Sequence, residues 1–393
     1  MILTKCAACA TELGLTLGKK CGRCSTRYCG AACQKQHWEQ GGHDQLCKKM
    51  KKAGGAEQYH ANTKYTEAVA VAAEACADDT KGQTCYICTQ ALHWKTKEGL
   101  VRGCSCRGTA GFAHVSCLAE QAKILCAEAE ENNLGSKVFS ERWVRWYACS
   151  LCEQDHHGVV RCALGWACWK TYVGRPETDV FFCNAMKQLG NGLTAAGDNE
   201  DALSVSEAEL SILRRLDAGD RTMLIAQNNL AGSYHKLGRL EQAVSLQRDV
   251  YYGWVKLYGE EHEQALRAAN NYADSLRSLR RYAEAKALLR KIIPVTRRVF
   301  GENHELTLKM RWNYAMTLYQ DTGATLDDLG EAVTTLEETE RAARRLLGGA
   351  HPTVSGIERN LRNARARRAA LIACEGDVDA LREALEAMTP GNA

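Results

Sequence analysis

The spacing of its cysteines constrains this chain more than any other feature of the sequence. The chain has 393 residues and 20 cysteines, and most of the cysteines come in pairs separated by one to three residues. Seven lie in residues 1–50 and ten lie in residues 81–175, whereas only Cys183 and Cys374 follow. A pair at such spacing places two thiolates on one metal ion, and two pairs complete the tetrahedral site that Zn²⁺ prefers. The sequence therefore predicts two zinc-stabilised segments ahead of a region poor in ligands.

Composition and charge exclude some classes of partner. The longest apolar run, VVRCALGWACW, is shorter than the roughly 18 residues of a membrane helix and contains Arg161, so we expect no membrane span. The start, MILTKCAACA, lacks the apolar core of a secretory signal. We expect a cytoplasmic or nuclear chain whose CxxC pairs bind metal rather than form disulfides. The formal net charge is +4, but the basic residues are spread out, so we expect no nucleic-acid partner.

The first cysteine-rich segment, residues 1–50, is too short to bury a useful core, so bound metal would supply much of its folding free energy. A tyrosine precedes the fifth cysteine (Tyr28), and His37-Trp38 follows in an expected helix. The segment offers eight potential ligands in four pairs, which are Cys6 and Cys9, Cys21 and Cys24, Cys29 and Cys33, and His43 and Cys47.

These features resemble the MYND zinc finger. The resemblance implies interleaved ligand pairs and a structural, non-ligating His37. It also implies that the finger binds short proline-containing peptides. The implied zinc sites are Cys6, Cys9, Cys29 and Cys33 for one ion, and Cys21, Cys24, His43 and Cys47 for the other.

The second segment, residues 81–175, again offers eight ligands in four pairs around the stretch CSCRGTAGFAHVSC. With a cysteine as fourth ligand and a histidine as fifth, it resembles the RING-CH finger. The resemblance implies one zinc ion on Cys85, Cys88, His114 and Cys117, and a second on Cys104, Cys106, Cys149 and Cys152.

Two departures from that family leave alternatives open. The gap between Cys117 and Cys149 is long and contains LAEQAKILCAEAEENN, which predicts an inserted helix. Further candidates follow the last pair and could replace Cys149 or Cys152 as ligands. These are Cys162, Cys168 and two histidines, His156 and His157, that we expect on a solvated turn.

A RING-CH resemblance implies that the finger docks a ubiquitin-conjugating enzyme through an apolar surface. Ile87, inside the first CxxC pair, matches one position of that surface. The family's tryptophan after the HxxC pair is missing, although Trp143 or Trp146 could fold back to replace it. The residue after the final cysteine is Glu153, so no cation is available there to contact ubiquitin.

The third region is an internal repeat with a period of 42 residues. The copies start at Asn228, Asn270 and Trp312, the last with a five-residue insertion, and a degenerate copy covers residues 187–216. Repeats of this length predict stacked helix pairs. Alanines that recur in each copy are expected where the helices cross closely, and histidines that close each copy are expected to pack in loops. The alanines are Ala231, Ala273, Ala315, Ala243, Ala285 and Ala332, and the histidines are His262, His304 and His351.

This pattern resembles tetratricopeptide repeats of the kinesin-light-chain type over about residues 185–365. The resemblance implies a concave peptide groove, in which asparagine amides bond a peptide backbone and cations favour acidic peptides. Alternatively, the asparagines bond neighbouring helices. The expected groove residues are Asn228, Asn229, Asn270, Asn271, Asn313, Arg267, Arg277 and Lys309.

Together these patterns predict a mostly α chain, with two small cross-braced zinc fingers and four zinc ions ahead of an α-solenoid. The predicted domains are residues 1–50 (MYND-type finger), 51–80 (charged linker and helix), 81–175 (RING-CH-type finger) and 176–393 (repeat solenoid with capping helices). We expect a protein that binds proteins or peptides, either as a RING-type ubiquitin ligase that recruits a conjugating enzyme or as a non-enzymatic scaffold. We expect no catalytic residue of its own, because RING-type fingers act by positioning. The cysteines outside the pairs, which are Cys76, Cys126, Cys183 and Cys374, are expected to be small buried hydrophobes.

Overall fold

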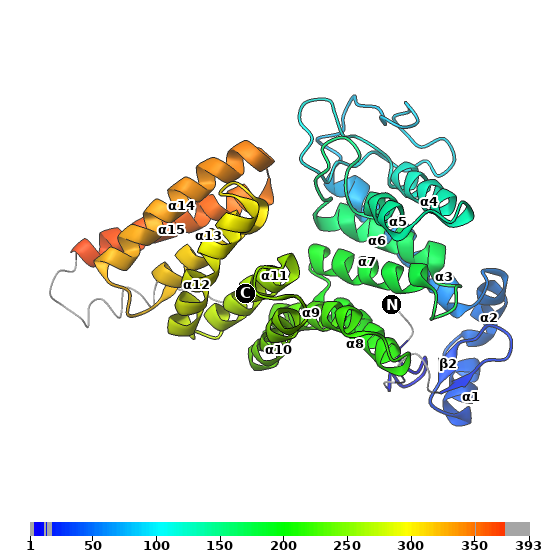
Figure 1. Cartoon of the computed structure of the whole chain (residues 1–393). Coiled ribbons are helices and arrows are strands. Elements are labelled where there is room, and N and C mark those ends of the chain that lie inside the picture. Colours follow the sequence, from blue (N-terminus) through cyan, green and yellow to red (C-terminus); the bar gives the residue numbers. More distant parts are fainter. Residues whose placement is uncertain (1–3, 12, 14–17, 350, 374–393) are drawn as a thin grey trace. The chain divides into compact units, whose positions relative to one another are not determined.

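Figure 1 shows the computed structural model of the chain, which describes residues 4–11, 13, 18–349 and 351–373. The fold is mostly α-helical, as predicted. The chain divides into two compact units, Met1–Leu237 and Gly238–Ala393, while the boundaries between the four predicted domains stay predictions. Among the described residues, no helix combines the length and apolar character that a membrane crossing requires. Cys374 lies outside the described residues.

The elements of the described residues are divided between the two units. In the first unit they are β1 (Lys19–Lys20), β2 (Arg27–Tyr28), α1 (Ala31–Glu39), α2 (His43–Lys52), α3 (Ala56–Ala75), α4 (Val115–Glu131), α5 (Ser136–Trp143), the 3-10 helix η1 (Val144–Trp146), α6 (Gly158–Tyr172), α7 (Val180–Ala196), α8 (Asn199–Arg215) and α9 (Asp220–Lys236). In the second unit they are α10 (Leu240–Tyr258), α11 (Glu263–Ser278), α12 (Tyr282–Phe300), α13 (Glu305–Gln320), α14 (Leu326–Leu347) and α15 (Pro352–Ala373).

The N-terminal segment folds around a small core made largely of cysteines. Strands β1 and β2 pair antiparallel, with Lys19 opposite Tyr28. Tyr28 is fully buried, and its hydroxyl lies 2.9 Å from Nδ1 of His37 on α1. The expected helix that carries His37 and Trp38 is therefore present, and a tyrosine–histidine hydrogen bond ties it to the hairpin.

Helix α3, predicted from YTEAVAVAAEACA, joins the core of the segment that follows it. Tyr65 and Val69 are buried with the residues of α6, and Gln58 donates to the carbonyl of Lys170 at 2.8 Å. The ammonium group of Lys170 lies 3.4 Å from the centre of the Tyr65 ring, within the range of a cation–π contact. These contacts hold α3 against the helical part of the second zinc segment.

The long gap between Cys117 and Cys149 contains α4, as predicted, followed by α5. One continuous apolar core runs from α3 through α4 and α6 to α7 and α8. Trp143 and Trp146 are buried in it with Tyr172 and Phe181, so the expectation that either tryptophan folds back onto a docking surface is wrong.

Helices α6 and α7 cross at close range because glycines face the crossing. A Cβ atom at Gly165 would lie 2.8 Å from the carbonyl oxygen of Gln188, and one at Gly192 would lie 2.9 Å from that of Arg161. Any side chain at either position would force the backbones apart, so these glycines allow the cysteine-rich segment to share a core with the helices that follow.

His156 does not lie on a solvated turn, which corrects the expectation for this residue. It is 3% exposed, and neither ring nitrogen has a hydrogen-bond partner among the described residues. Cys162 and Cys168 are buried on α6, and Cys126 is buried on α4, as small hydrophobes. Cys76 and Cys183 are only partly buried.

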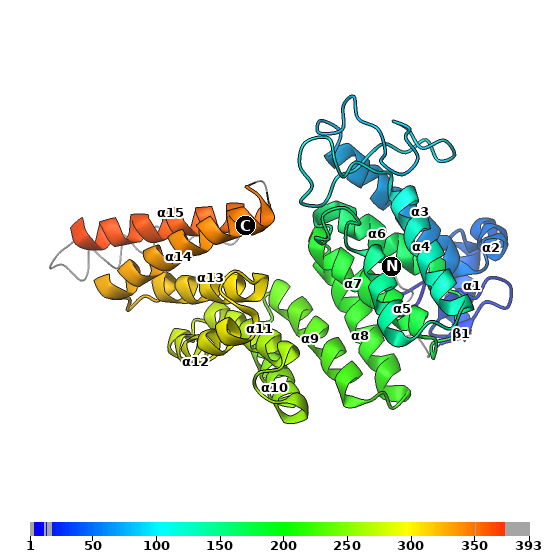
Figure 2. The ribbon, with the colours of Figure 1, turned by 45° about the horizontal axis from the view of Figure 1, so that its top comes forward.

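In the second unit each helix packs against the next, from α10 through α15 (Figure 2). The six repeated alanines of both units are fully buried, which confirms the prediction that they lie at close helix contacts. The repeated histidines accept hydrogen bonds at Nδ1 from the backbone N–H two residues later, each at 3.2 Å, and therefore satisfy amides at helix starts. His262 and His304 also stack on Tyr258 and Phe300.

We predict that His156 makes the stability of the first unit depend on pH. Burial lowers the pKa of His156 to about 4, whereas an unfolded chain takes up the proton near pH 6.5. Stability is therefore lost as the pH falls from 6.5 towards 4, by about 3 kcal/mol for this group.

The measurement is the free energy of unfolding of the wild type and of a His156→Leu variant between pH 7.5 and 4.5. Zinc release affects both proteins, so the difference between them isolates His156. Parallel pH profiles would contradict the prediction.

Candidate metal centres

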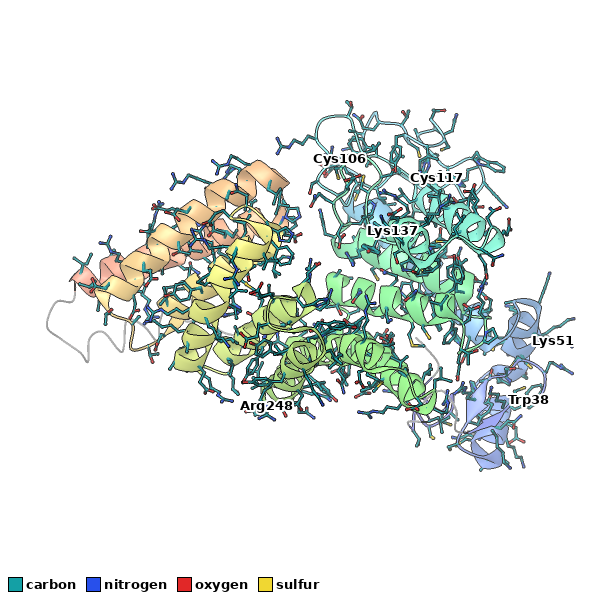
Figure 3. The ribbon with its side chains drawn as sticks, viewed as in Figure 1. Trp38, Lys51, Cys106, Cys117, Lys137 and Arg248 are labelled. Carbon is teal, nitrogen blue, oxygen red and sulfur yellow. The ribbon has the colours of Figure 1, made fainter. Side chains whose placement is uncertain are left out.

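The structure brings the sixteen predicted ligands into four groups of four, and each group has the membership given by the interleaved pairing. Within each group the ligand atoms lie within 4.8 Å of one another. Cys106 and Cys117, labelled in Figure 3, belong to the two groups of the second segment. The groups are Cys6, Cys9, Cys29 and Cys33; Cys21, Cys24, His43 and Cys47; Cys85, Cys88, His114 and Cys117; and Cys104, Cys106, Cys149 and Cys152.

The sulfur separations suit a tetrahedral zinc ion. Four sulfurs at about 2.3 Å from zinc lie about 3.8 Å apart. The observed Sγ–Sγ distances are 3.6 Å for Cys9 and Cys29, 3.9 Å for Cys21 and Cys47, and 3.8 Å for Cys106 and Cys149. All cysteines in the described residues are free thiols, and these distances are far longer than the roughly 2.0 Å of a disulfide bond.

All four CxxC pairs have the same backbone turn, which sequence reasoning did not describe. The residue after the second cysteine has a positive φ and donates its N–H to the carbonyl of the first cysteine, at 2.8–3.0 Å. The first cysteine in turn donates its N–H to the carbonyl five residues later. The positive-φ residues are Ala10 (57°), Ser25 (62°), Thr89 (61°) and Glu153 (58°).

This shared turn bears on the alternatives left open for the last pair. Cys149 and Cys152 form the same turn as the other three pairs, and N–H groups inside the turns point at sulfur, Ile87 at Cys85 and Leu151 at Cys149, both at 3.4 Å. A positive φ costs a non-glycine residue about 1 kcal/mol, so each turn needs a compensating interaction. A dication shared by the thiolates would provide one.

The two histidines of the groups are oriented as metal ligands. Nδ1 of His114 lies 3.4 Å from the sulfur of Cys88 and 3.6 Å from that of Cys117, while its Nε2 lies 3.3 Å from the carbonyl oxygen of Ala91. That outer hydrogen bond fixes the tautomer that leaves Nδ1 free to coordinate. Burial lowers the pKa of His43 and of His114, which favours the neutral imidazole that binds metal.

Thiol pKa values show how unfavourable the groups are without a cation. Burial, followed by hydrogen bonds to Cys24 and Cys21, raises the pKa of Cys47 to about 12. Burial also raises the pKa of Cys106 to about 12. In contrast, the hydrogen bond from Cys104 lowers the pKa of Cys149 to about 4. Some thiols of these groups, such as Cys47 and Cys106, therefore keep their protons unless a metal ion replaces them, and Zn²⁺ fits both the donor set and the spacing.

Two of the predicted groove residues are engaged within the second unit. Asn313 is 3% exposed, its amide donates to the carbonyl of Asn270 at 3.2 Å, and Arg277 donates to its Oδ1 at 3.2 Å. Asn313 therefore bonds a neighbouring helix, which is the alternative stated for the asparagines. Oδ1 of Asn270 is buried without a partner among the described residues.

The remaining groove residues differ in their surroundings. Arg267 pairs with Glu263 and Lys309 with Glu305, each one turn earlier on its own helix, and both cations are partly exposed. Asn228 and Asn229 lie on α9 in the first unit, and Asn271 lies on α11 in the second. Binding of a peptide by these residues stays a prediction.

Sequence reasoning missed two exposed apolar residues of the second zinc segment. Leu151 is 52% exposed in the last CxxC turn, and Trp94 is 68% exposed shortly after the first. For Leu151 a signal existed, because CYIC and CSLC both carry an aliphatic residue at the third position, whereas CAAC and CGRC of the first segment do not. In that first segment, Trp38 is the exposed aromatic residue (Figure 3).

Comparison with known proteins places two modules on the chain. The family model described as MYND finger matches residues 6–47, and the model described as tetratricopeptide repeat matches residues 222–295 and 264–325. No curated protein sequence matches the chain.

Solved structures are similar only at low identity. The crystal structure of a Podosopora anserina putative kinesin light chain with nearly identical TPR-like repeats is 19% identical. The match covers 59% of this chain and 97% of that one, with a TM-score of 0.36. For BtubC (BKLC) from P. vanneervenii the values are 15% identity, 71% and 95% coverage, and a TM-score of 0.40.

The chain therefore contains a MYND finger, which is a zinc-binding module, and tetratricopeptide repeats. Both are modules that bind proteins.

We predict that the shared turn limits which residues can follow each CxxC pair. Glu153→Val places a β-branched residue at a φ of 58° and should destabilise the zinc-loaded second segment by about 1–2 kcal/mol, whereas Glu153→Gly should be neutral or stabilising. The measurement is the melting temperature of the wild type and of both variants in excess zinc. Equal melting temperatures for the two variants would show that the turn is not under strain.

Proposed function

We propose that this chain is a RING-type ubiquitin ligase in a reducing compartment, the cytoplasm or nucleus. In this proposal the second zinc segment docks a ubiquitin-conjugating enzyme, and the tetratricopeptide groove and the MYND finger recruit the substrate. The four ligand groups hold four zinc ions. A reducing compartment keeps the thiols available for zinc.

One observation carries the proposal, and it is an exposed aliphatic pair on two adjacent zinc turns. Ile87 is 37% exposed in the first CxxC turn of the segment and Leu151 is 52% exposed in the last. The hydroxyl of Tyr86 lies 3.0 Å from Oγ of Ser150, which joins the two turns directly beside these residues. In this proposal the two side chains form one apolar surface, on two turns that the metal groups of the segment would hold.

The loop after the first turn adds to the apolar character of this segment. Leu92 and Trp94 are 59% and 68% exposed, on either side of His93. The ring of His93 is buried and lies 5.3 Å from that of His114, a ligand of the first metal group of the segment. Trp94 is thus a candidate for the aromatic residue that Trp143 and Trp146 do not supply, because it stands on a loop anchored at the metal group.

The chemistry requires positioning rather than a nucleophile from this chain. An amine of the substrate attacks the thioester carbonyl that joins ubiquitin to the conjugating enzyme. An isopeptide bond forms, the amine loses a proton, and the enzyme's cysteine leaves as a thiolate. Holding the thioester in one pose and the substrate nearby lowers the entropic part of the barrier. The groove cations and MYND finger would raise the local substrate concentration.

A specific observation favours the scaffold as the second candidate function. Glu153 follows the last ligand, so this position offers a carboxylate where a cation would help to hold ubiquitin. In a scaffold, the exposed pair Ile87 and Leu151 would bind a protein that is not a conjugating enzyme.

We predict that the full zinc-loaded chain accelerates ubiquitin discharge from at least one charged conjugating enzyme, and that Ile87→Ala slows this about tenfold or more by removing a central apolar contact. Loss of the thioester to free lysine is followed by gel electrophoresis. The matched control is Ile124→Ala, since Ile124 is 50% exposed on α4 and belongs to neither turn.

The full chain is needed because the core of the second segment continues into α3, α7 and α8. If no enzyme in a broad panel is discharged faster, the ligase proposal is wrong and the scaffold remains. Equal losses in Ile87→Ala and Ile124→Ala would show that the exposed pair is not the docking surface.

We also predict about four zinc ions per chain by elemental analysis. Cys9→Ser and Cys104→Ser should each remove one ion, since each cysteine belongs to a different group. A content of about two ions in the wild type would show that only one of the two segments binds zinc, which would contradict the prediction.

A further inference from the structure

A pocket of about 540 Å³ lies within the second unit, between α12, α13 and α14. These helices follow one another in the repeat stack and lie side by side in Figures 1 and 2. The volume is in the range of ligand-binding clefts. None of the predicted groove residues lines it, so the pocket is separate from the groove.

The charges that line the pocket do not balance. Its walls carry five arginines and three glutamates. Arg311 pairs with Glu302 and Glu338, Glu302 also pairs with Arg297, and Glu331 pairs with a third arginine, Arg290. All three carboxylates are therefore already engaged with arginines.

Two arginines are left over, Arg341 and Arg345, one helical turn apart on α14. Neither forms an ion pair with any residue in the described part of the chain, and Arg341 only donates to the backbone carbonyl of Glu337, at 3.3 Å. The acids just before Arg341 on the helix are taken, because Glu337 pairs with Arg365, Glu340 pairs with Arg344, and Glu338 pairs with Arg311 as stated above. Two adjacent guanidinium groups without a counter-charge form a site that matches carboxylates.

One part of the pocket wall is apolar. It includes Ile293 and Pro294 of α12, while Ala342 lies between the two arginines on α14. The site therefore combines two cations with an apolar patch. A peptide can match both, whereas a small inorganic anion matches only the cations.

We propose that this pocket binds an acidic peptide, with carboxylates paired to Arg341 and Arg345 and a neighbouring apolar side chain against Ile293 and Pro294. This second peptide site is independent of the ligase activity and of the groove. It would let the repeat region hold a partner while the groove remains open for another.

The experiment measures binding of the fluorescein-labelled peptide Leu-Glu-Glu-Leu-Glu-Glu to the full zinc-loaded chain by fluorescence anisotropy. The double variant R341Q/R345Q should raise Kd about tenfold, because two charge-assisted contacts are lost. Glutamine keeps helix propensity close to that of arginine, so the fold should be retained, and circular dichroism checks this. Binding should also weaken as salt is raised.

The matched control is R359Q/R362Q, which removes the same charge from exposed arginines of α15 outside the pocket and should leave Kd within about twofold. If both double variants lose the same affinity for the peptide, net charge alone explains the effect and the proposal is wrong. Binding that falls in R267Q/K309Q but not in R341Q/R345Q would also contradict it, since that would place the peptide in the groove.

Two further measurements test whether the pocket recognises the carboxylates of a peptide or any small anion. The glutamine counterpart of the peptide should not bind measurably, and equal binding would show that carboxylates are not recognised. Inorganic pyrophosphate should compete only weakly. If pyrophosphate binds through Arg341 and Arg345 while the peptide does not, the pocket is a small-anion site and the peptide proposal fails.

Discussion

The crowding of thiolates into four groups is the interaction on which the N-terminal part of the structure depends. Two unit charges about 4 Å apart repel by about 4 kcal/mol at an effective dielectric constant of about 20. Three or four sulfurs within 4.8 Å of one another are therefore stable only with protons or a cation between them. Each group also draws together two pairs that are distant in sequence. A cation in each group would turn this repulsion into folding free energy, above all for the first segment, which has little apolar core.

The four CxxC turns show how backbone and metal chemistry support each other. Each turn holds a non-glycine residue at positive φ, which is unfavourable in isolation. The same conformation directs backbone N–H groups at sulfur, as Ile87 and Leu151 do, and these bonds stabilise a thiolate. In the second segment the side chains of these two residues are exposed. Both are aliphatic, and their exposure is the observation on which the ligase proposal rests.

Within the first unit, the second zinc segment is packed against the neighbouring helices and is not a separate body on a flexible linker. Its core continues through α3 and α6 into α7 and α8, with Gly165 and Gly192 permitting the close crossing of α6 and α7. A partner docked at Ile87 and Leu151 is therefore attached to a rigid helical body. The second unit has a different feature, because α14 contributes two arginines without an ion pair among the described residues to a pocket that Ile293 and Pro294 of α12 also line.

Local patterns in the sequence determined the ligand pairs, the helical repeat and the buried alanines, because spacing of two to four residues sets which side chains share a metal or a helix face. They also predicted α4 and the helical region around α3. The tertiary structure decided what depends on contacts between distant residues. It buried His156, Trp143 and Trp146 in a core shared by α3 through α8, and it used Asn313 to bond Asn270. Burial and partner choice of this kind arise from helix crossings between segments far apart in the chain, and no local pattern of residues encodes them.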